Sequence, residues 1–251
     1  MDNTDHFCVP IHPHERLDDL HRNGYSIIQD PKRFCFGQDA VLLAAFAKAH
    51  AGELALDLCA GTGIVSILMA ARTQAQKLYG LEIQPESVDM ARRSVALNGL
   101  SHQIQIDSGD IKEAAALYAL SSFDVITANP PYMNHGGGLT NSYSPKAIAR
   151  HEILCNLGDV TEAAAKLLKP QGRFYMVHRP GRLPDILESL RQNHLEPKAM
   201  RLVHSYIHKE PSMVLIEAIR NGKPLLKVLP PLIICQEDGQ YTEEAYEIYY
   251  R

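Results

Sequence analysis

From residue 53 onward, short apolar runs alternate with longer segments in which apolar residues recur every three or four positions. The short runs are typical of buried strands, and the three-to-four spacing is typical of helices packed on a core. Such alternation predicts βαβ units, in which a parallel sheet carries helices on both faces. The predicted strands are 53–58, 77–81, 104–106 and 124–128, and the predicted helices are 63–72, 85–98 and 112–118.

The same pattern continues after a glycine-rich connection at Gly136-Gly137-Gly138. A long amphipathic helix is expected over about 146–168, ended by Lys169-Pro170-Gln171-Gly172, because proline and glycine terminate helices. The remaining predicted elements are strands at 173–177, 199–204 and 213–218 and a helix at 183–192. The fold class is therefore α/β, with a mostly parallel sheet of seven strands.

The two ends of the chain differ from this core. Residues 1–23 are polar and predict a short helix or a loose arm, and residues 25–29 predict a short strand. A helix is expected over 40–47, with Asp39 at the N-cap position. We therefore divide the chain into an N-terminal arm and covering segment (1–50), a core (51–227) and a C-terminal extension packed on the core (228–251).

Composition limits the classes of protein that the chain can represent. Of its 251 residues, 45% are hydrophobic, yet no apolar run approaches the length of roughly 18 residues that a membrane span requires. Residues 1–5 are acidic and lack the apolar region of a secretory signal. The five cysteines are scattered, without a C-x-x-C pair. This argues for a reducing cytoplasm and against a disulfide framework or a zinc site.

The histidines and the distribution of charge bear on whether the chain binds a metal or a polyanion. The chain has 12 histidines, but the pairs His12/His14 and His204/His208 have no acidic or thiol partner at ligand spacing, so no metal is expected. The formal charge of the chain is −4. Counted along the sequence, the balance is −6 over residues 1–139, +6 over 140–227 and −4 over 228–251. Only the middle block is therefore a candidate face for a polyanion.

The first core strand leads directly into a glycine turn, Asp57-Leu58-Cys59-Ala60-Gly61-Thr62-Gly63, which precedes a helix. Glycines at Gly61 and Gly63 allow a ligand to approach the backbone, and the helix N-terminus attracts a negative group. Alone, this pattern also fits a plain βα turn. A dinucleotide dehydrogenase is a further alternative, but it normally needs a third glycine where this chain has Ser66.

Acidic residues follow the next two strands. Glu82 ends the second strand, 21 residues after Gly61, which is the spacing expected for an acid that binds a ribose diol. Asp110 follows the third strand, where its carboxylate could accept a hydrogen bond from an adenine amino group, and Ile111 could offer its backbone N–H. Together with the glycine turn, they predict a pocket for an adenine nucleoside at one edge of the sheet.

The fourth strand ends at Asn129-Pro130-Pro131-Tyr132. Two prolines fix the backbone and remove two N–H donors, so an amide side chain and an aromatic ring are held rigidly at the ligand-binding edge of the sheet. The Asn129 side-chain oxygen and the Pro130 carbonyl could bind the two N–H groups of an exocyclic amine. Tyr132 could stack on the planar group that carries the amine.

This arrangement of motifs resembles the class I S-adenosylmethionine-dependent methyltransferases, which have a Rossmann-like fold. The resemblance implies S-adenosyl-L-methionine as the cofactor and an enzyme that methylates nitrogen. It assigns Asn129, Pro130 and Tyr132 to catalysis. It assigns to cofactor binding the residues Asp57, Cys59, Gly61, Gly63, Glu82, Ile83, Asp110, Ile111 and Asn129.

The Asn-Pro-Pro-Tyr tetrapeptide does not by itself identify the substrate. Methyltransferases that carry it also methylate glutamine side chains of proteins, guanine of ribosomal RNA and adenine of DNA. The stretch Phe34-Cys35-Phe36-Gly37-Gln38-Asp39-Ala40-Val41-Leu42-Leu43 is more specific. It resembles the bacterial tRNA (adenine-N(6))-methyltransferases that modify the adenosine 3′ of the anticodon in a valine tRNA. The similarity extends over roughly residues 20–245.

That resemblance implies a tRNA substrate, and it places Phe36, Gly37 and Asp39 over the methionine end of the cofactor. Tyr132, Lys146, Arg150, Arg179 and Arg182 are the expected substrate-binding residues. Methylation of protein glutamine or ribosomal RNA remains an alternative, as does a non-catalytic RNA-binding protein with a relic pocket. The sequence leaves the oligomeric state open.

Overall fold

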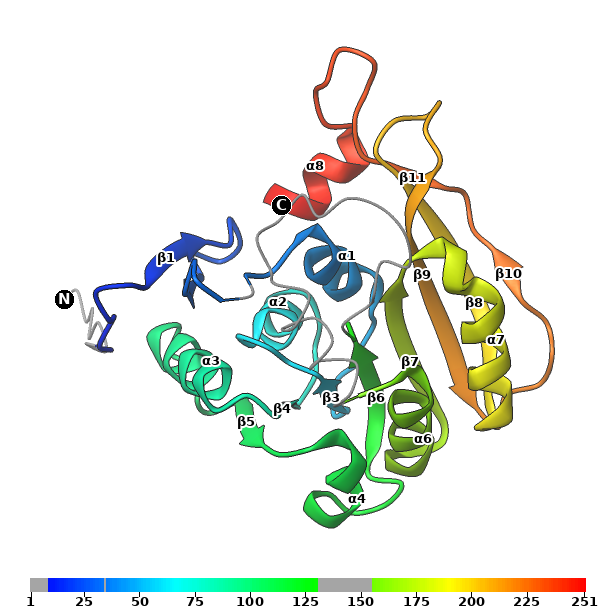
Figure 1. Cartoon of the computed structure of the whole chain (residues 1–251), viewed down its shortest axis with the longest axis horizontal. Helices are drawn as coiled ribbons and strands as arrows, with labels where there is room; N and C mark the ends of the chain where they lie inside the picture. Colours follow the sequence, from blue (N-terminus) through cyan, green and yellow to red (C-terminus); the bar gives the residue numbers. More distant parts are fainter. Residues whose placement is uncertain (1–8, 34, 131–154) are drawn as a thin grey trace.

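The computed structural model describes residues 9–33, 35–130 and 155–251. Its centre is a mixed sheet in the order β8-β9-β7-β6-β3-β4-β5 (Figure 1). Strand β9 is antiparallel to both of its neighbours, and the other four adjacent pairs, β7–β6, β6–β3, β3–β4 and β4–β5, are parallel. The strands are β3 (Leu54–Leu58), β4 (Lys77–Glu82), β5 (Ile104–Ser108), β6 (Phe123–Ala128), β7 (Leu168–His178), β8 (Leu195–His204) and β9 (Pro211–Arg220).

All seven predicted core strands are present, but the sheet has nine strands in the described residues. Two short strands, β10 (Lys227–Val228) and β11 (Leu232–Ile233), add to the outer edge of β8. The prediction of seven strands is therefore too low. Strands of two residues have no periodicity to detect, and their pairing is set by the neighbouring strand.

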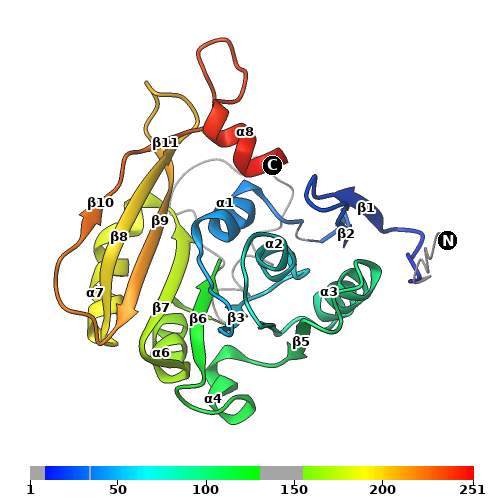
Figure 2. The same ribbon diagram turned by 180° about the vertical axis from the view of Figure 1, so that it is seen from behind.

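Helices cover both faces of the sheet, and each face has its own core. Alternate residues of a strand point to opposite faces, so Ala55 of β3 joins one cluster while Leu56 and Leu58 join the other. The first cluster contains α1 (Gln38–Phe46), α2 (Ile64–Arg72) and α3 (Pro85–Leu97). The second contains α4 (Ala114–Leu117), α6 (Leu157–Leu167) and α7 (Leu183–Gln192). Figure 2 shows this arrangement from behind.

The N-terminal segment forms a hairpin in place of the predicted helix or loose arm. Strand β1 (Arg16–Asp19) pairs antiparallel with β2 (Ser26–Gln29). The backbone N–H of Ser26 donates to Oδ1 of Asn98, the C-cap residue of α3, at 2.9 Å, and that of Ile28 donates to Ser94 Oγ of α3 at 3.0 Å. The hairpin is thereby fixed to the core by hydrogen bonds that sequence periodicity does not reveal.

Several predicted helix boundaries are wrong. Helix α1 has Gly37, not Asp39, at its N-cap, and Asp39 lies inside the first turn. The prediction of a single helix over 146–168 is wrong. Helix α6 begins at Leu157, because Asn156 caps it by accepting from the Asp159 N–H at 3.0 Å. The predicted helix 112–118 divides into a 3₁₀ turn (Ile111–Glu113) and α4. Capping contacts decide these ends more strongly than apolar spacing does.

The chain ends in α8 (Glu243–Tyr250), which packs against α1. Arg22 and Arg72 donate to the carbonyls of Glu247 and Ile248 in its last turn, where helix carbonyls lack partners of their own. Arg201 of β8 binds both oxygens of Glu244. Among the described residues, no helix has both the length and the apolar character needed to cross a membrane.

Candidate active site

The strand register brings the ends of five strands to one edge of the sheet. Leu58 of β3 pairs with Leu81 of β4 and with Ala128 of β6, and Ala128 pairs with Met176 of β7. Glu82, at the end of β4, pairs with Ser108 of β5. The residues that follow each of these strands therefore lie next to one another, as ligand-binding residues do in open α/β sheets.

The glycine turn after β3 has an unusual backbone. Cys59, Gly61 and Gly63 all have positive φ, of 63°, 55° and 85°. A Cβ at Gly63 would lie 3.2 Å from the Cβ of Ala91 in α3, so only glycine fits there without strain. At Gly61, a Cβ would meet no atom within 4 Å, so the backbone at Gly61 borders open space.

Glu82 ties the second strand to this turn. Its Oε2 accepts from the Gly61 N–H at 2.8 Å, and its Oε1 accepts from the Gln84 N–H at 2.9 Å. The residue is only 5% exposed, so these two backbone donors fix its direction. Each carboxylate oxygen keeps a second lone pair for a ligand. The adjacent Ile83 is 36% exposed at the same edge.

Asp57 lies at the base of the turn and is buried. Thr127 Oγ1 of β6 donates to its Oδ1 at 2.7 Å. Burial raises the pKa of Asp57 to about 7, against the lowering effect of the Thr127 hydrogen bond, and the nearby Glu82 carboxylate raises it further. Cys59 is next to Cys155, and its hydrogen bond with that residue, together with burial, raises the pKa of its thiol.

Strand β5 is followed by a turn that Asp110 caps. Asp110 Oδ1 accepts from the Lys112 N–H at 2.9 Å, which begins the 3₁₀ turn Ile111–Glu113. The side chain of Ile111 is 6% exposed and belongs to the core below α4. Asp110 therefore has a fixed orientation at the same edge as Glu82 and Asp57.

Asn129 and Pro130 follow β6 directly, and Pro130 is buried while Asn129 is half-buried. Pro131 and Tyr132, the other half of the predicted tetrapeptide, lie outside the described residues. Leu58 pairs with Ala128, so Asn129, the next residue, lies beside the start of the glycine turn. The structure thus brings together the predicted residues after β3, β4, β5 and β6.

His178 is a further residue at this edge, for which sequence reasoning had given no role. It ends β7, two residues after Met176, just as Pro130 follows Ala128 by two residues. Its Nδ1 accepts from the Arg179 N–H at 2.8 Å. Burial and then the nearby Arg182 charge lower its pKa to about 4. The ring is therefore neutral at pH 7 and carries its proton on Nε2.

Of the predicted covering residues, Phe36 and Gly37 lie in the connection between β2 and α1, and Asp39 lies in the first turn of α1. Gly37 is exposed, Phe36 is half-buried, and Asp39 Oδ1 accepts from the Ala40 N–H at 3.0 Å. The backbone N–H of Phe36 donates to Gln29 Oε1 at 3.0 Å. Gln29 also donates to Thr62 Oγ1 of the glycine turn at 2.7 Å. Sequence reasoning missed Gln29, because an isolated glutamine at the end of a short strand carries no local signal.

The predicted substrate cations are only partly described. Lys146 and Arg150 lie outside the described residues. Arg179 is exposed and donates to the Ser212 carbonyl at 3.1 Å, so its guanidinium lies near the start of β9. Arg182 is paired with Asp185 at 2.7 Å, which reduces the charge that it offers to a substrate.

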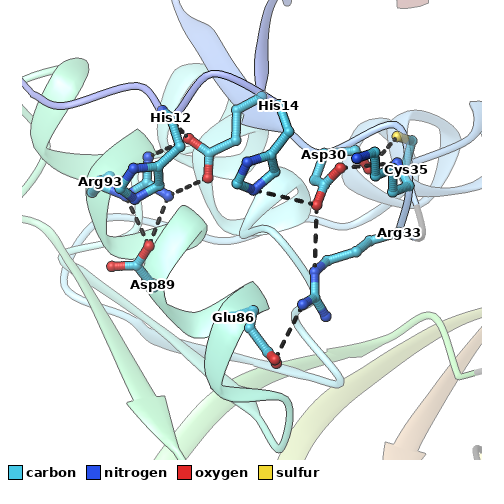
Figure 3. Close-up of polar contacts among 10 residues, drawn as sticks. His12, His14, Asp30, Arg33, Cys35, Glu86, Asp89 and Arg93 are labelled. Atoms are coloured by element: carbon cyan, nitrogen blue, oxygen red, sulfur yellow. Dashed lines mark hydrogen bonds and ion pairs between the residues drawn. The ribbon is translucent and has the colours of Figure 1, made fainter.

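One group of potential metal ligands occurs in the described residues, and it lies away from this edge. His12, Glu15 and Asp89 place ligand atoms within 4.8 Å of one another. The fold thus supplies acidic neighbours that the sequence spacing of His12 had not indicated. Arg93 binds Glu15 at 2.6 Å and Asp89 at 2.7 Å, so one guanidinium already occupies oxygens of both carboxylates. Figure 3 labels Arg93 and Asp89 in this cluster. This cluster fixes the N-terminal arm to α3.

Comparisons with known proteins agree with this architecture. Residues 49–237 match the family model described as "Methyltransferase domain". The chain is 33% identical over 187 residues to the tRNA1(Val) (adenine(37)-N6)-methyltransferase of Porphyromonas gingivalis, with 72% of each chain covered. A predicted O-methyltransferase from Agrobacterium tumefaciens superposes with a TM-score of 0.69 at 21% identity, covering 84% of this chain and 95% of that one.

A second solved structure, of TYW2 from M. jannaschii in complex with AdoMet, has a TM-score of 0.57 at 13% identity and covers 82% of this chain and 85% of that one. The likeness to both structures is one of fold. The family model matches most of the chain, and the P. gingivalis enzyme is 33% identical over 72% of it. This chain therefore belongs to the methyltransferase-domain family, together with the tRNA1(Val) (adenine(37)-N6)-methyltransferases.

Proposed function

We propose that this protein transfers the methyl group of S-adenosyl-L-methionine to the N6 amino group of an unpaired adenosine in a tRNA anticodon loop. By analogy with the names of its relatives, adenosine 37 of tRNA1(Val) is the proposed target. The cytoplasm, where tRNA is modified in bacteria, is the proposed location. The proposal rests on the family and on the arrangement of the active-site edge.

The observation that carries the proposal is the position of Asn129. It follows β6 directly, and β6 lies beside β3, whose end carries the glycine turn. An amide oxygen and the Pro130 carbonyl therefore stand next to the proposed cofactor pocket. Two acceptors at this place suit a substrate amine, which offers two N–H groups.

The residues around the turn fit S-adenosyl-L-methionine. Open space borders the Gly61 backbone, as a ligand that approaches the main chain requires. Glu82 has lone pairs left for the two ribose hydroxyls, and Asp110 with the Ile111 N–H would hold the adenine. Asp57 and the segment containing Phe36 would face the methionine end. When bound, the cofactor supplies a methyl group on a sulfonium, which is an excellent leaving group.

The protein has to make the adenine amine a better nucleophile and orient its lone pair toward the methyl carbon. The lone pair of an adenine N6 is delocalised into the ring, so the free amine attacks poorly. Hydrogen bonds to Asn129 Oδ1 and the Pro130 carbonyl would draw the nitrogen toward sp³ geometry and turn its lone pair to the methyl carbon. Positioning and these two acceptors would supply most of the catalysis.

The nitrogen must lose a proton once it carries the methyl group. His178 is not suited to take that proton, because its Nδ1 already accepts from the Arg179 N–H. We therefore assign proton removal to solvent. Tyr132 would stack on the flipped-out base. Lys146, Arg150 and Arg179 would contact phosphates, with a smaller contribution from Arg182, which is paired with Asp185.

The test is methyl transfer from labelled S-adenosyl-L-methionine into total tRNA from a strain that lacks this gene, followed by nucleoside mass spectrometry. We expect N(6)-methyladenosine in a single isoacceptor. The Asn129→Ala protein is the matched negative control. Label in ribosomal RNA or in protein glutamine, with none in tRNA, would overturn the substrate and leave the methyltransferase assignment intact.

A further inference from the structure

Gln29 makes three hydrogen bonds and is completely buried, with 0% of its surface exposed. Its Nε2 donates to Thr62 Oγ1 at 2.7 Å and to the Ile28 carbonyl at 3.2 Å. Its Oε1 accepts from the Phe36 N–H at 3.0 Å. One side chain thus connects strand β2, the glycine turn and the segment that precedes α1.

The hydrogen-bonding groups of this amide match their partners. Both N–H groups face acceptors and the oxygen faces a backbone donor, so this orientation of the amide is the one that the network requires. Removing the amide would leave the partly buried Phe36 N–H and the buried Ile28 carbonyl without this partner. Buried polar groups that lose a partner are costly.

The strand that carries Gln29 is a fixed platform. Through their backbone N–H groups, Ser26 is bound to Asn98, the C-cap residue of α3, and Ile28 is bound to Ser94 of α3. On the other side, the Asp30 carboxylate lies 3.5 Å from Arg33 and 3.7 Å from His14, and Arg33 reaches Glu86 of α3 at 3.1 Å (Figure 3). Gln29 therefore projects from a backbone that is anchored before and after it.

Thr62, by contrast, lies between two glycines with positive φ. Glycine gives a backbone more conformational freedom than any other residue, so the turn needs outside contacts to hold one shape. Glu82 fixes the turn at the Gly61 N–H, and Gln29 fixes it at the Thr62 side chain. Of these two residues, only Gln29 also binds the segment that precedes α1, where it accepts from the Phe36 N–H.

We propose that Gln29 is a positioning residue for the cofactor site, which locks the glycine turn and the Phe36 segment together so that they bind S-adenosyl-L-methionine as one unit. The inference rests on the proposed function, because it takes the glycine turn to be the cofactor site. It predicts that loss of the Gln29 amide weakens cofactor binding with little effect on the methyl-transfer step.

The test compares Gln29→Met, which keeps the side-chain volume, with Asn98→Ala, which loosens β2 on α3 and leaves the Gln29 contacts in place. S-adenosyl-L-methionine binding is measured by calorimetry on the folded full-length proteins. We expect Kd to rise about tenfold for Gln29→Met, in line with the loss of a buried hydrogen bond, and less than about twofold for Asn98→Ala. In steady state, KM for the cofactor rises, while KM for tRNA and kcat at saturating cofactor stay within about twofold.

A partner variant protects the test against poor folding of Gln29→Met. Thr62→Val removes the hydroxyl that Gln29 binds, and it should weaken cofactor binding by a similar factor. The double variant should be no weaker than the worse of the two single variants, because both changes break the same contact. Hydrogen exchange should also be faster at the Phe36 amide in Thr62→Val than in wild type with cofactor bound.

Equal loss of affinity in Gln29→Met and Asn98→Ala would mean that Gln29 only stabilises the fold, and it would overturn the inference. Unchanged affinity in both Gln29→Met and Thr62→Val would overturn it as well. Failure of the proposed function is a separate result, seen as a wild-type protein that binds S-adenosyl-L-methionine but forms no N(6)-methyladenosine in tRNA. Binding by the variants still decides the role of Gln29 in that case.

Discussion

Thr127 and Asp57 are direct partners in the register of β6 and β3, and the Thr127 hydroxyl donates to Asp57 Oδ1 at 2.7 Å. Thr127 precedes Asn129 by two residues, and Asp57 opens the glycine turn. The strand that carries the proposed catalytic amide is thus joined by a side-chain bond to the strand that carries the proposed cofactor turn. The proposed substrate and cofactor positions are therefore held relative to each other by one pair of neighbouring strands.

Asn129→Ala is expected to lower kcat by about 10²- to 10³-fold, the range measured when an oriented hydrogen-bonding group is removed from an active site. Binding of S-adenosyl-L-methionine should be nearly unchanged. Single-turnover methylation of tRNA and calorimetry with the cofactor measure the two effects. Asn129→Asp keeps a side-chain acceptor and should retain more activity. A fully active Asn129→Ala protein would refute the proposed mechanism.

Glu82→Ala is expected to weaken cofactor binding by about tenfold or more, because it removes the proposed ribose acceptor and frees the Gly61 and Gln84 N–H groups that it now holds. The control is Glu86→Ala, an exposed residue of α3 that pairs with Arg33. Isothermal titration with S-adenosyl-L-methionine measures both. Equal affinity in the two variants would remove Glu82 from the cofactor site.

Asp57→Asn is expected to stabilise the fold at pH 8. Burial raises the pKa of Asp57 to about 7 from its ordinary value of 3.8, so the folded protein binds more protons than the unfolded chain between these values. The contribution of Asp57 to stability is thus complete below pH 3.8 and is lost as the pH rises through 7. The amide oxygen can still accept from Thr127.

Thermal unfolding of both proteins at pH 5 and pH 8 measures this effect. The gain in melting temperature should be larger at pH 8 than at pH 5. Cofactor affinity provides an independent comparison, since Asp57→Asn should weaken it if the carboxylate serves the pocket. A gain of the same size at both pH values would show that the carboxylate does not titrate in the folded state as described.

Gly63→Ala is expected to destabilise the protein by about 2–3 kcal/mol. The substitution combines about 1–2 kcal/mol for a left-handed backbone with a close contact to the Cβ of Ala91, 3.2 Å away. Gly99 is the matched control: its φ of 68° is similar, but its added Cβ would meet nothing within 4 Å. Gly99→Ala should therefore cost only about 1–2 kcal/mol. Urea denaturation measures both, and equal costs would contradict the steric argument.

Arg179→Ala is expected to raise KM for tRNA several-fold and to reduce the dependence of KM on salt, as loss of a phosphate contact does. Arg182→Ala should have a smaller effect, because Arg182 already pairs with Asp185. Steady-state methylation at two salt concentrations compares the variants. KM for S-adenosyl-L-methionine should stay constant in both. Identical tRNA kinetics in wild type and Arg179→Ala would exclude Arg179 from the substrate surface.

The sequence determined the core of this fold, because its signals are local. Alternating apolar runs located all seven core strands, and helix α7 was predicted at its observed bounds. The positions of Asp57, Glu82, Asp110 and Asn129 after successive strands predicted that they would meet, since parallel strands end at one edge. Family resemblance supplied the cofactor and the substrate class.

Only the tertiary structure decided the features that depend on contacts between distant residues. The N-terminal hairpin forms because β1 and β2 pair with each other and dock on α3, and α6 begins where Asn156 caps it. The raised pKa of Asp57 comes from burial that no sequence window contains. Gln29 connects to Thr62, 33 residues away, through a side-chain hydrogen bond that has no period and no motif.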